Sequence, residues 1–174
     1  MDLTHELETA KTIARMAASI CQNIQDELIV TEKSGHEPVT IADYASQALI
    51  LSALANNFED DAVLAEEHSE EYELLLSDPQ RQLVARYVED ALGGYVFAED
   101  ISAYLDFGRK HEAERLWVVD PIDGTKGFVA VEIYYCHTQA LNLPVFTLFV
   151  PNPLMIHAYT IMPLPAAAPT PTPR

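Results

Sequence analysis

The stretch WVVDPIDGTKGF, from Trp117 to Phe128, decides the fold because two acidic residues follow directly after a short apolar run. The run from Leu116 to Val119 predicts a short buried strand. Asp120 and Asp123 follow this run, and a proline stands directly after the first of them. Because proline fixes its own backbone and restricts the preceding residue, we expect a rigid turn that aims both carboxylates at one point.

Other acidic residues also stand where a predicted element begins or ends. Asp43 lies in the first turn of a predicted helix, and Glu66 and Glu67 end an apolar run that starts at Asp61. In α/β sheets, ligand sites collect at the carboxyl ends of the strands. We therefore expect these acids to converge with Asp120 at one site.

A convergence of carboxylates favours a particular chemistry. Carboxylates that lie close together repel, and a hard divalent cation removes that cost. With oxygen ligands and no cluster of histidine or cysteine, Mg²⁺ is the expected ion. Gly124 and Thr125 follow Asp123, and a glycine beside a helix start lets N–H groups approach a phosphate. The combination predicts metal-assisted hydrolysis of a phosphate ester.

Each of these features also has a plainer interpretation when it is taken alone. Asp43 can serve only the cap of its helix. Glu66 and Glu67 can be solvated charges at a strand end, and an Asp-Pro-Ile-Asp-Gly segment is often only a turn. The segment from Asp106 to Gly108 has the Asp-Phe-Gly sequence of kinases. No glycine-rich phosphate loop precedes it, so we interpret it as a connector.

Apolar spacing predicts an alternation of helices and short strands. The predicted helices cover residues 4–28, 40–58 and 77–93, the predicted strands 61–67 and 116–119, and the segments 30–40 and 99–115 are predicted as an extended arm and a charged connector. Thr40 and Asp43 form the Thr-x-x-Asp pattern of a capping box, and Gly93 ends the third helix. The alternation predicts an α/β or layered α+β fold.

The composition argues against some classes of partner. The chain has 174 residues, which suits one domain with a core, and its formal net charge of -17 repels nucleic acid and anionic membranes. No secretory signal and no apolar run of about 20 residues is found. Two cysteines, Cys21 and Cys136, are too few for a disulfide scaffold and favour a reducing, cytoplasmic location. No oligomeric state is predicted.

The composition changes abruptly after Phe128. All six glycines precede this point, whereas eight of the eleven prolines lie from Pro144 to Pro173. The charged residues beyond it are Glu132 and Arg174. We therefore predict two parts, a domain portion over residues 1–128 and an apolar, proline-rich, poorly ordered tail over residues 129–174.

Three segments resemble, in the same order, those of a known enzyme family. DPIDGTKGF (120–128) closely resembles the signature of 3'(2'),5'-bisphosphate nucleotidases, which belong to the lithium-sensitive inositol monophosphatase-like superfamily of Mg²⁺ phosphatases. PVTIADYASQ (38–47) resembles the family's loop-to-helix segment, and VLAEEHSEE (63–71) resembles its Gly-Glu-Glu-Ser segment. The segment Lys126-Gly127-Phe128 favours the nucleotidase branch over the inositol branch. The resemblance implies a layered α+β fold of the inositol monophosphatase and fructose-1,6-bisphosphatase type, with an incomplete sheet.

The resemblance also implies metal ligands. Glu66 and Asp120 would hold a first Mg²⁺ together with the carbonyl of Ile122. Asp120 and Asp123 would bridge to a second ion.

The remaining implied roles concern the attack on phosphorus. Asp43 would pair with Thr125 and activate the attacking water, and the N–H groups of Gly124 and Thr125 would face the phosphate. The implied reaction removes the 3'-phosphate of adenosine 3',5'-bisphosphate and leaves AMP. The sulfated analogue, 3'-phosphoadenylyl sulfate, is the other implied substrate, so the expected partner is a small nucleotide bisphosphate.

After Phe128 the chain departs from the family pattern, in which a second domain completes the metal and substrate sites. We therefore expect a truncated chain with weak or no turnover, since catalysis requires ligands and substrate to be held closely in position. Two alternatives remain open. One is an inositol or sugar phosphatase of the same superfamily, and the other is a non-catalytic, metal-binding fragment.

Overall fold

The computed structural model describes residues 4–25, 30–32, 38–109, 113, 115–123, 135–141, 146–151 and 157–160, with side chains described for residues 4–24, 39–109, 113 and 115–122. In chain order the elements are α1 (Thr4–Gln25), β1 (Val30–Glu32), β2 (Pro38–Thr40), α2 (Ile41–Asn57), β3 (Ala62–Ala65), α3 (Ser69–Leu75), α4 (Asp78–Leu92), α5 (Ala98–Leu105), β4 (Leu116–Asp123), β5 (Tyr135–Leu141), β6 (Phe146–Pro151) and β7 (His157–Thr160).

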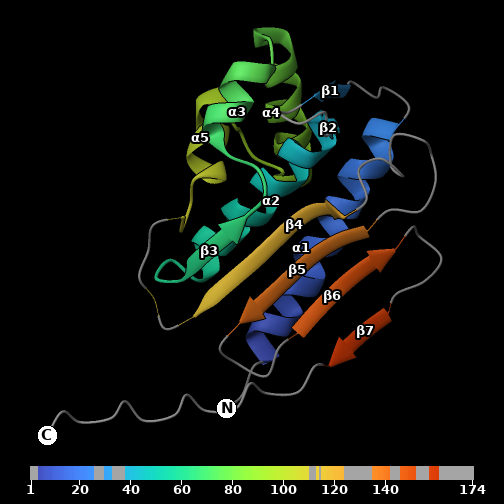
Figure 1. Ribbon diagram of the computed structural model, residues 1–174, viewed down its shortest axis with the longest axis vertical. Helices are drawn as coiled ribbons and strands as arrows, with labels where there is room; N and C mark the ends of the chain where they lie inside the picture. The colour runs from blue at the N-terminus through green and yellow to red at the C-terminus, as the bar shows by residue number, and fades with distance from the viewer. Residues whose placement is uncertain are drawn as a thin grey trace, which may run out of the picture.

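Helix α2 runs through the middle of the core (Figure 1). Every residue from Ile41 to Ser52 is buried, and the helix packs against α1, α4, α5 and β4. A helix that is apolar nearly all round is stable when neighbours cover it on every side. The predicted capping box is confirmed, because the Thr40 side chain accepts from the N–H groups of Ala42 and Asp43 while the Asp43 carboxylate accepts from the Thr40 N–H.

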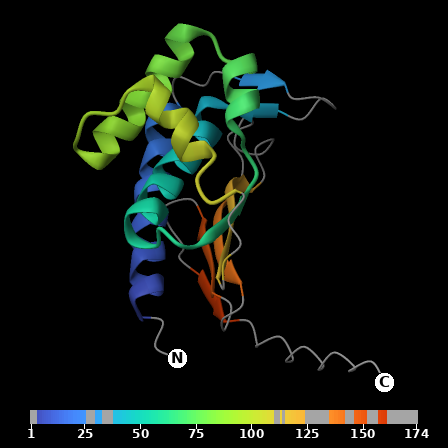
Figure 2. The same ribbon diagram turned by 90° about the vertical axis from the view of Figure 1, so that its left-hand side faces the viewer.

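The described strands β3 to β7 form one sheet in the order β3-β4-β5-β6-β7. Strands β3 and β4 are parallel, and the other neighbours are antiparallel. Helix α1 packs against β5 and β6, and α2 packs against β4. Figure 2 shows both helices on the same side of the sheet, and the described part of the chain places no helix on the other side. This arrangement confirms the predicted layered α+β class.

Strand β3 is buried at its first two residues, Ala62 and Val63, and more exposed at the next two. Val63 and Trp117 are register partners on β3 and β4, and both are buried against the helices. Leu64 alternates to the opposite face, where its side chain is 59% exposed. The prediction of a buried strand is therefore wrong at Leu64, since burial of a strand depends on what covers each of its residues.

Helices α3 and α5 were not predicted, and the predicted charged connector over residues 99–115 was wrong where it contains α5. Ile101 and Leu105 lie four positions apart and are buried, but two apolar residues in a short helix give a weak periodic signal. Asp106 follows α5 and accepts hydrogen bonds from the N–H and the hydroxyl of Ser69, the first residue of α3. The Asp-Phe-Gly segment forms the turn after α5, as interpreted from the sequence.

Buried Asp61 joins the start of β3 to the start of β4. Its Oδ2 accepts from the Trp117 indole N–H at 2.7 Å and from Arg115 Nε at 2.6 Å. The Arg115 guanidinium also lies 4.8 Å above the Phe58 ring. The carboxylate is thus satisfied by two donors, as a buried charge requires.

The predicted boundary after Phe128 falls in residues 124–134, outside the described residues, so it stays a prediction, as does the poor order of residues 129–174. Strands β5, β6 and β7 lie within residues 135–160 and extend the sheet. Among the described residues, no helix combines the length and the apolar character that a membrane crossing needs.

We predict that Gly108→Ala destabilises the fold by about 3 kcal/mol, because strain and a clash act together. Gly108 has φ +69°, and an added Cβ would lie 2.7 Å from Val63 Cγ2 and 2.9 Å from the Val63 nitrogen. Urea unfolding followed by the fluorescence of the single tryptophan, Trp117, measures the change.

Gly93→Ala is the matched control. Gly93 has φ +71° at the end of α4, but an added Cβ would meet nothing within 4 Å. Only the left-handed backbone is then penalised, at about 1 kcal/mol. Equal losses for the two variants would contradict the steric part of the explanation.

Candidate metal and phosphate site

The parallel register of β3 and β4 brings two of the predicted metal ligands to the same edge of the sheet, just beyond the last paired residues. The parallel register ends with Ala65 opposite Val119. Glu66 and Asp120 each stand one position beyond that pair. Glu66 is exposed and Asp120 is half-buried. Residues far apart in sequence thus become neighbours through strand pairing.

Strand β4 is longer than predicted and carries an irregularity between Asp120 and Asp123. The strand advances three residues between these positions, whereas its partner β5 advances two, from His137 to Tyr135. The extra residue is a β-bulge, a feature that redirects side chains at the ends of strands. Pro121 fits there because proline has no N–H to donate to a ladder. The prediction of a separate turn after Val119 is therefore corrected to a bulged strand end.

Asp43 lies at the start of α2 and is 1% exposed. Its Oδ2 accepts from the Thr40 N–H and from the Thr40 hydroxyl, each at 2.7 Å. Asp43 therefore takes part in the cap of its helix, and its predicted catalytic role stays a prediction. This cap holds the carboxylate in one orientation, which is also what a catalytic role would require.

Gln47 links α2 to the acidic end of β3. Its Nε2 donates to the Glu67 carbonyl at 2.6 Å, and its Oε1 accepts from the Glu67 N–H at 2.8 Å. Gln47 and Asp43 lie four positions apart, so they share one face of the helix. Gln47 ends the segment PVTIADYASQ, and no role for it was predicted from the sequence. An amide residue one helical turn after a capping aspartate, within an apolar helix, was the sequence signal that could have indicated such a role.

Negative charge accumulates around the buried ring of Tyr44. Burial, and then the charges of Glu67, Glu71 and Asp43, raise the pKa of the Tyr44 hydroxyl. Among the described residues, this hydroxyl has no hydrogen-bond partner. A cation near these carboxylates would offset part of their mutual repulsion.

The donor chemistry of this edge fits a hard divalent cation, because the predicted ligands offer carboxylate oxygens. Within the described residues, however, no group of three or more His, Cys, Asp or Glu side chains is placed so that it could hold a metal ion. Ile122 is buried at the end of β4. The Asp123 side chain, Gly124 and Thr125 lie outside the described side chains, so their predicted roles stay predictions.

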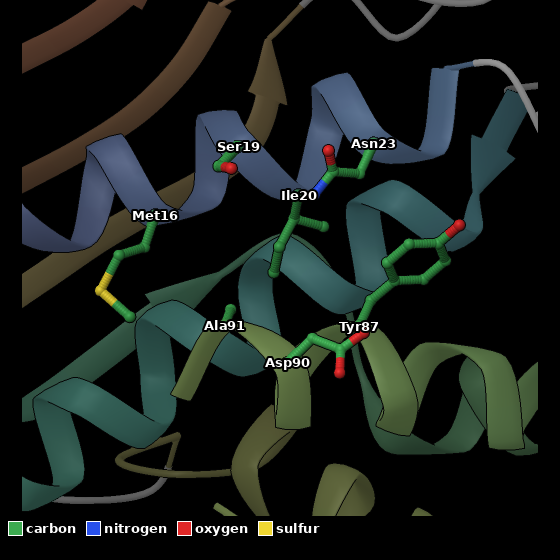
Figure 3. A pocket seen from close by; sticks show the side chains of 7 residues that line it. All are labelled: Met16, Ser19, Ile20, Asn23, Tyr87, Asp90 and Ala91. Atoms are coloured by element: carbon green, nitrogen blue, oxygen red, sulfur yellow. The ribbon is translucent and has the colours of Figure 1, made fainter. Parts of the chain in front are cut away.

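A separate hollow of about 280 Å³ lies between α1 and α4 (Figure 3). Its walls combine apolar and polar side chains, namely Met16, Ser19, Ile20, Asn23, Tyr87, Asp90 and Ala91. None of the predicted site residues lines it. The acidic edge of the sheet therefore remains the candidate site.

Comparison with protein-family models matches residues 2–138 to the inositol monophosphatase family. The chain belongs to this family of layered α+β phosphatases. Among curated proteins it is similar to 3'(2'),5'-bisphosphate nucleotidase 2 of Candida albicans, with 34% identity over 71% of this chain and 39% of the relative. It is equally similar to 3'(2'),5'-bisphosphate nucleotidase 1 of Arabidopsis thaliana, with 34% identity over 74% of this chain and 40% of the relative.

Solved structures show the same fold. An IMPase of Thermotoga maritima matches with a TM-score of 0.54 and 18% identity, over 89% of this chain and 51% of that protein. An IMPase/NADP phosphatase solved with NADP and Ca²⁺ matches with a TM-score of 0.55 and 14% identity, over 91% of this chain and 52% of that protein. The chain thus spans 39–40% of the length of the two curated relatives and about half of these structures.

We predict that Thr40→Val destabilises the protein by about 1–2 kcal/mol, the usual cost of losing an N-cap. The valine keeps the shape of the side chain but removes the oxygen that accepts from the N–H groups of Ala42 and Asp43. Urea unfolding measures the loss. Thr40→Ser should retain most of the stability.

Thr12→Val on α1 is the matched control for this change. The Thr12 hydroxyl is exposed and donates to the Glu8 carbonyl at 2.8 Å. Replacing it should change stability by less than about 0.5 kcal/mol, as at other surface positions. An equal effect at both threonines would show that Thr40 does not act as a cap.

Proposed function

We propose that this chain forms part of an Mg²⁺-dependent phosphomonoesterase that removes the 3'-phosphate of adenosine 3',5'-bisphosphate and leaves AMP, with 3'-phosphoadenylyl sulfate as the second substrate. The observation that carries the proposal is the parallel register of β3 and β4, which ends with Ala65 opposite Val119 and so leaves Glu66 and Asp120 each one position beyond the last pair. The names of the curated relatives support the substrate. Family membership supports the reaction class.

In the proposed site, Glu66, Asp120, Asp123 and the carbonyl of Ile122 would hold Mg²⁺. The bound cation would neutralise charge on the phosphate and lower the pKa of an attacking water. These acids at one edge would also allow a protein of net charge -17 to accept a polyanionic substrate once cations are bound.

The β4 bulge supports the shared role of Asp120 and Asp123. In a regular strand, positions three apart alternate to opposite faces of the sheet. One inserted residue cancels that alternation. The bulge between these two positions is therefore the backbone feature that a joint metal site would require.

Asp43 and Thr125 would handle the proton of the attacking water. The Asp43 carboxylate, held by Thr40, would orient the water with Thr125 and accept its proton. A bond would form from the water oxygen to phosphorus, and the bond from phosphorus to the 3'-oxygen would break. The 3'-oxygen would take up a proton from solvent and leave as the 3'-hydroxyl of AMP, while the N–H groups of Gly124 and Thr125 would stabilise the phosphate oxygens.

A non-catalytic, metal-binding fragment is the second candidate function. One observation favours it, since the chain spans 39% of the length of its relative from Candida albicans. Metal binding without phosphate release would support this candidate.

We predict that the chain binds Mg²⁺ and that Glu66→Gln and Asp120→Asn each weaken this binding by at least about tenfold. Each change keeps the shape of the side chain and removes one negative charge. Isothermal titration calorimetry with Mg²⁺ measures the dissociation constant. Glu59→Gln, an exposed acid in the turn before β3, is the matched control and should leave the constant unchanged.

We also predict that this chain alone releases phosphate from adenosine 3',5'-bisphosphate far more slowly than ordinary enzymes, which turn over at about 1–1000 per second. A phosphate-release assay with Mg²⁺ measures the rate, and inositol monophosphate serves as the comparison substrate. Preference for the inositol ester would contradict the proposed substrate. Ordinary turnover of the nucleotide would contradict the expected loss of activity and support the enzyme.

A further inference from the structure

We infer that Gln47 is a positioning residue for the metal site, an inference that rests on the proposed function and deepens it. Gln47 is fully buried on α2, where its neighbours in sequence are mostly apolar. A buried amide must have its hydrogen bonds satisfied inside the protein. The Gln47 amide makes one donated and one accepted hydrogen bond, both with the backbone of one residue, Glu67.

The two hydrogen bonds act on the backbone of Glu67 and not on its side chain. The Gln47 amide donates to the Glu67 carbonyl at 2.6 Å and accepts from the Glu67 N–H at 2.8 Å. A neighbouring strand would present the same donor and acceptor, a backbone N–H and a backbone carbonyl, to Glu67. The ladder from β3 to β4 ends at Ala65, so Gln47 continues the backbone pairing two residues beyond the end of the ladder.

Glu66 stands between these two constraints. The ladder holds Ala65 on one side of it, and the Gln47 amide holds Glu67 on the other. The backbone of Glu66 is thereby restricted although its own side chain is exposed. Because a metal ligand must be held in position before the ion arrives, restriction of this backbone improves the affinity of the site.

Gln47 also sets the distance between the two halves of the proposed site. It lies one turn after Asp43 on the same face of α2, and it contacts the residue that follows Glu66. The proposed water-activating carboxylate and the proposed metal ligand thus belong to elements that one amide joins. A shift of the β3 end would alter the position of Glu66 relative to Asp43.

The test is Gln47→Met, which keeps the length of the side chain and removes both hydrogen bonds. We expect the dissociation constant for Mg²⁺ to rise by about 10- to 100-fold, the usual effect of losing a group that orients a metal ligand. Calorimetry measures this constant at a temperature where circular dichroism shows each variant to be folded. Amide hydrogen exchange at Glu67 should accelerate by about three- to tenfold, the equivalent of one lost hydrogen bond.

Ser52→Ala is the matched control. Ser52 is buried on the same helix, and its hydroxyl donates to the Leu49 carbonyl at 2.9 Å. Its loss should lower the unfolding temperature without changing the Mg²⁺ constant or the exchange at Glu67. If Gln47→Met does not fold, Gln47→Asn, which keeps a neutral amide one carbon shorter, is judged by the same criteria.

The outcomes separate this inference from the proposed function. If the parent chain binds Mg²⁺ and the folded Gln47 variant binds it equally well, Gln47 has a structural role only and the inference is overturned, while the proposed function stands. If the parent chain binds no Mg²⁺, the proposed function and the inference fail together. Weaker binding confined to the Gln47 variant supports both.

Discussion

Burial of helix α2 on every side is the constraint on which the rest of the structure depends. Its apolar residues belong to the core that it forms with α1, α4, α5 and β4. Water cannot reach a polar group inside such a core, so each must find a partner in the protein. Thr40 and Asp43 satisfy each other at the start of the helix, and Gln47 reaches the backbone of Glu67. The packing that excludes water therefore also ties the helix to the acidic end of β3.

Two features of the sheet complement this arrangement. Parallel pairing places Glu66 and Asp120 at the same edge, and the bulge in β4 inserts one residue before Asp123. Acids gathered in this way repel one another. Burial, and then the charges of Glu67, Glu71 and Asp43, raise the pKa of the Tyr44 hydroxyl. Folding thus builds a locally unfavourable charge distribution. A bound cation would relieve it, which is why the arrangement supports a metal-dependent function.

Local signals made α1, α2 and α4 predictable from the sequence. Thr40 and Asp43 marked the start of α2, and Gly93, with φ +71°, marked the end of α4. These signals work because a cap or a left-handed residue acts on neighbours a few positions away. Helix α5 was not predicted because it is short and has only one pair of buried apolar residues, Ile101 and Leu105. The 59% exposure of Leu64 was not predicted either, since no local sequence pattern shows which face of a strand other elements will cover.

The sequence by itself determined which acids are available and where they stand relative to the elements. Asp43, Glu66 and Asp120 were all recognisable at the ends of predicted elements, because apolar runs that stop at carboxylates are visible in one dimension. Only the tertiary structure decided that Glu66 and Asp120 are neighbours, that an extra residue separates Asp120 from Asp123, and that Gln47 holds the end of β3. Strand register and the partner of a buried amide depend on the simultaneous packing of distant segments, and no local stretch of the chain contains that information.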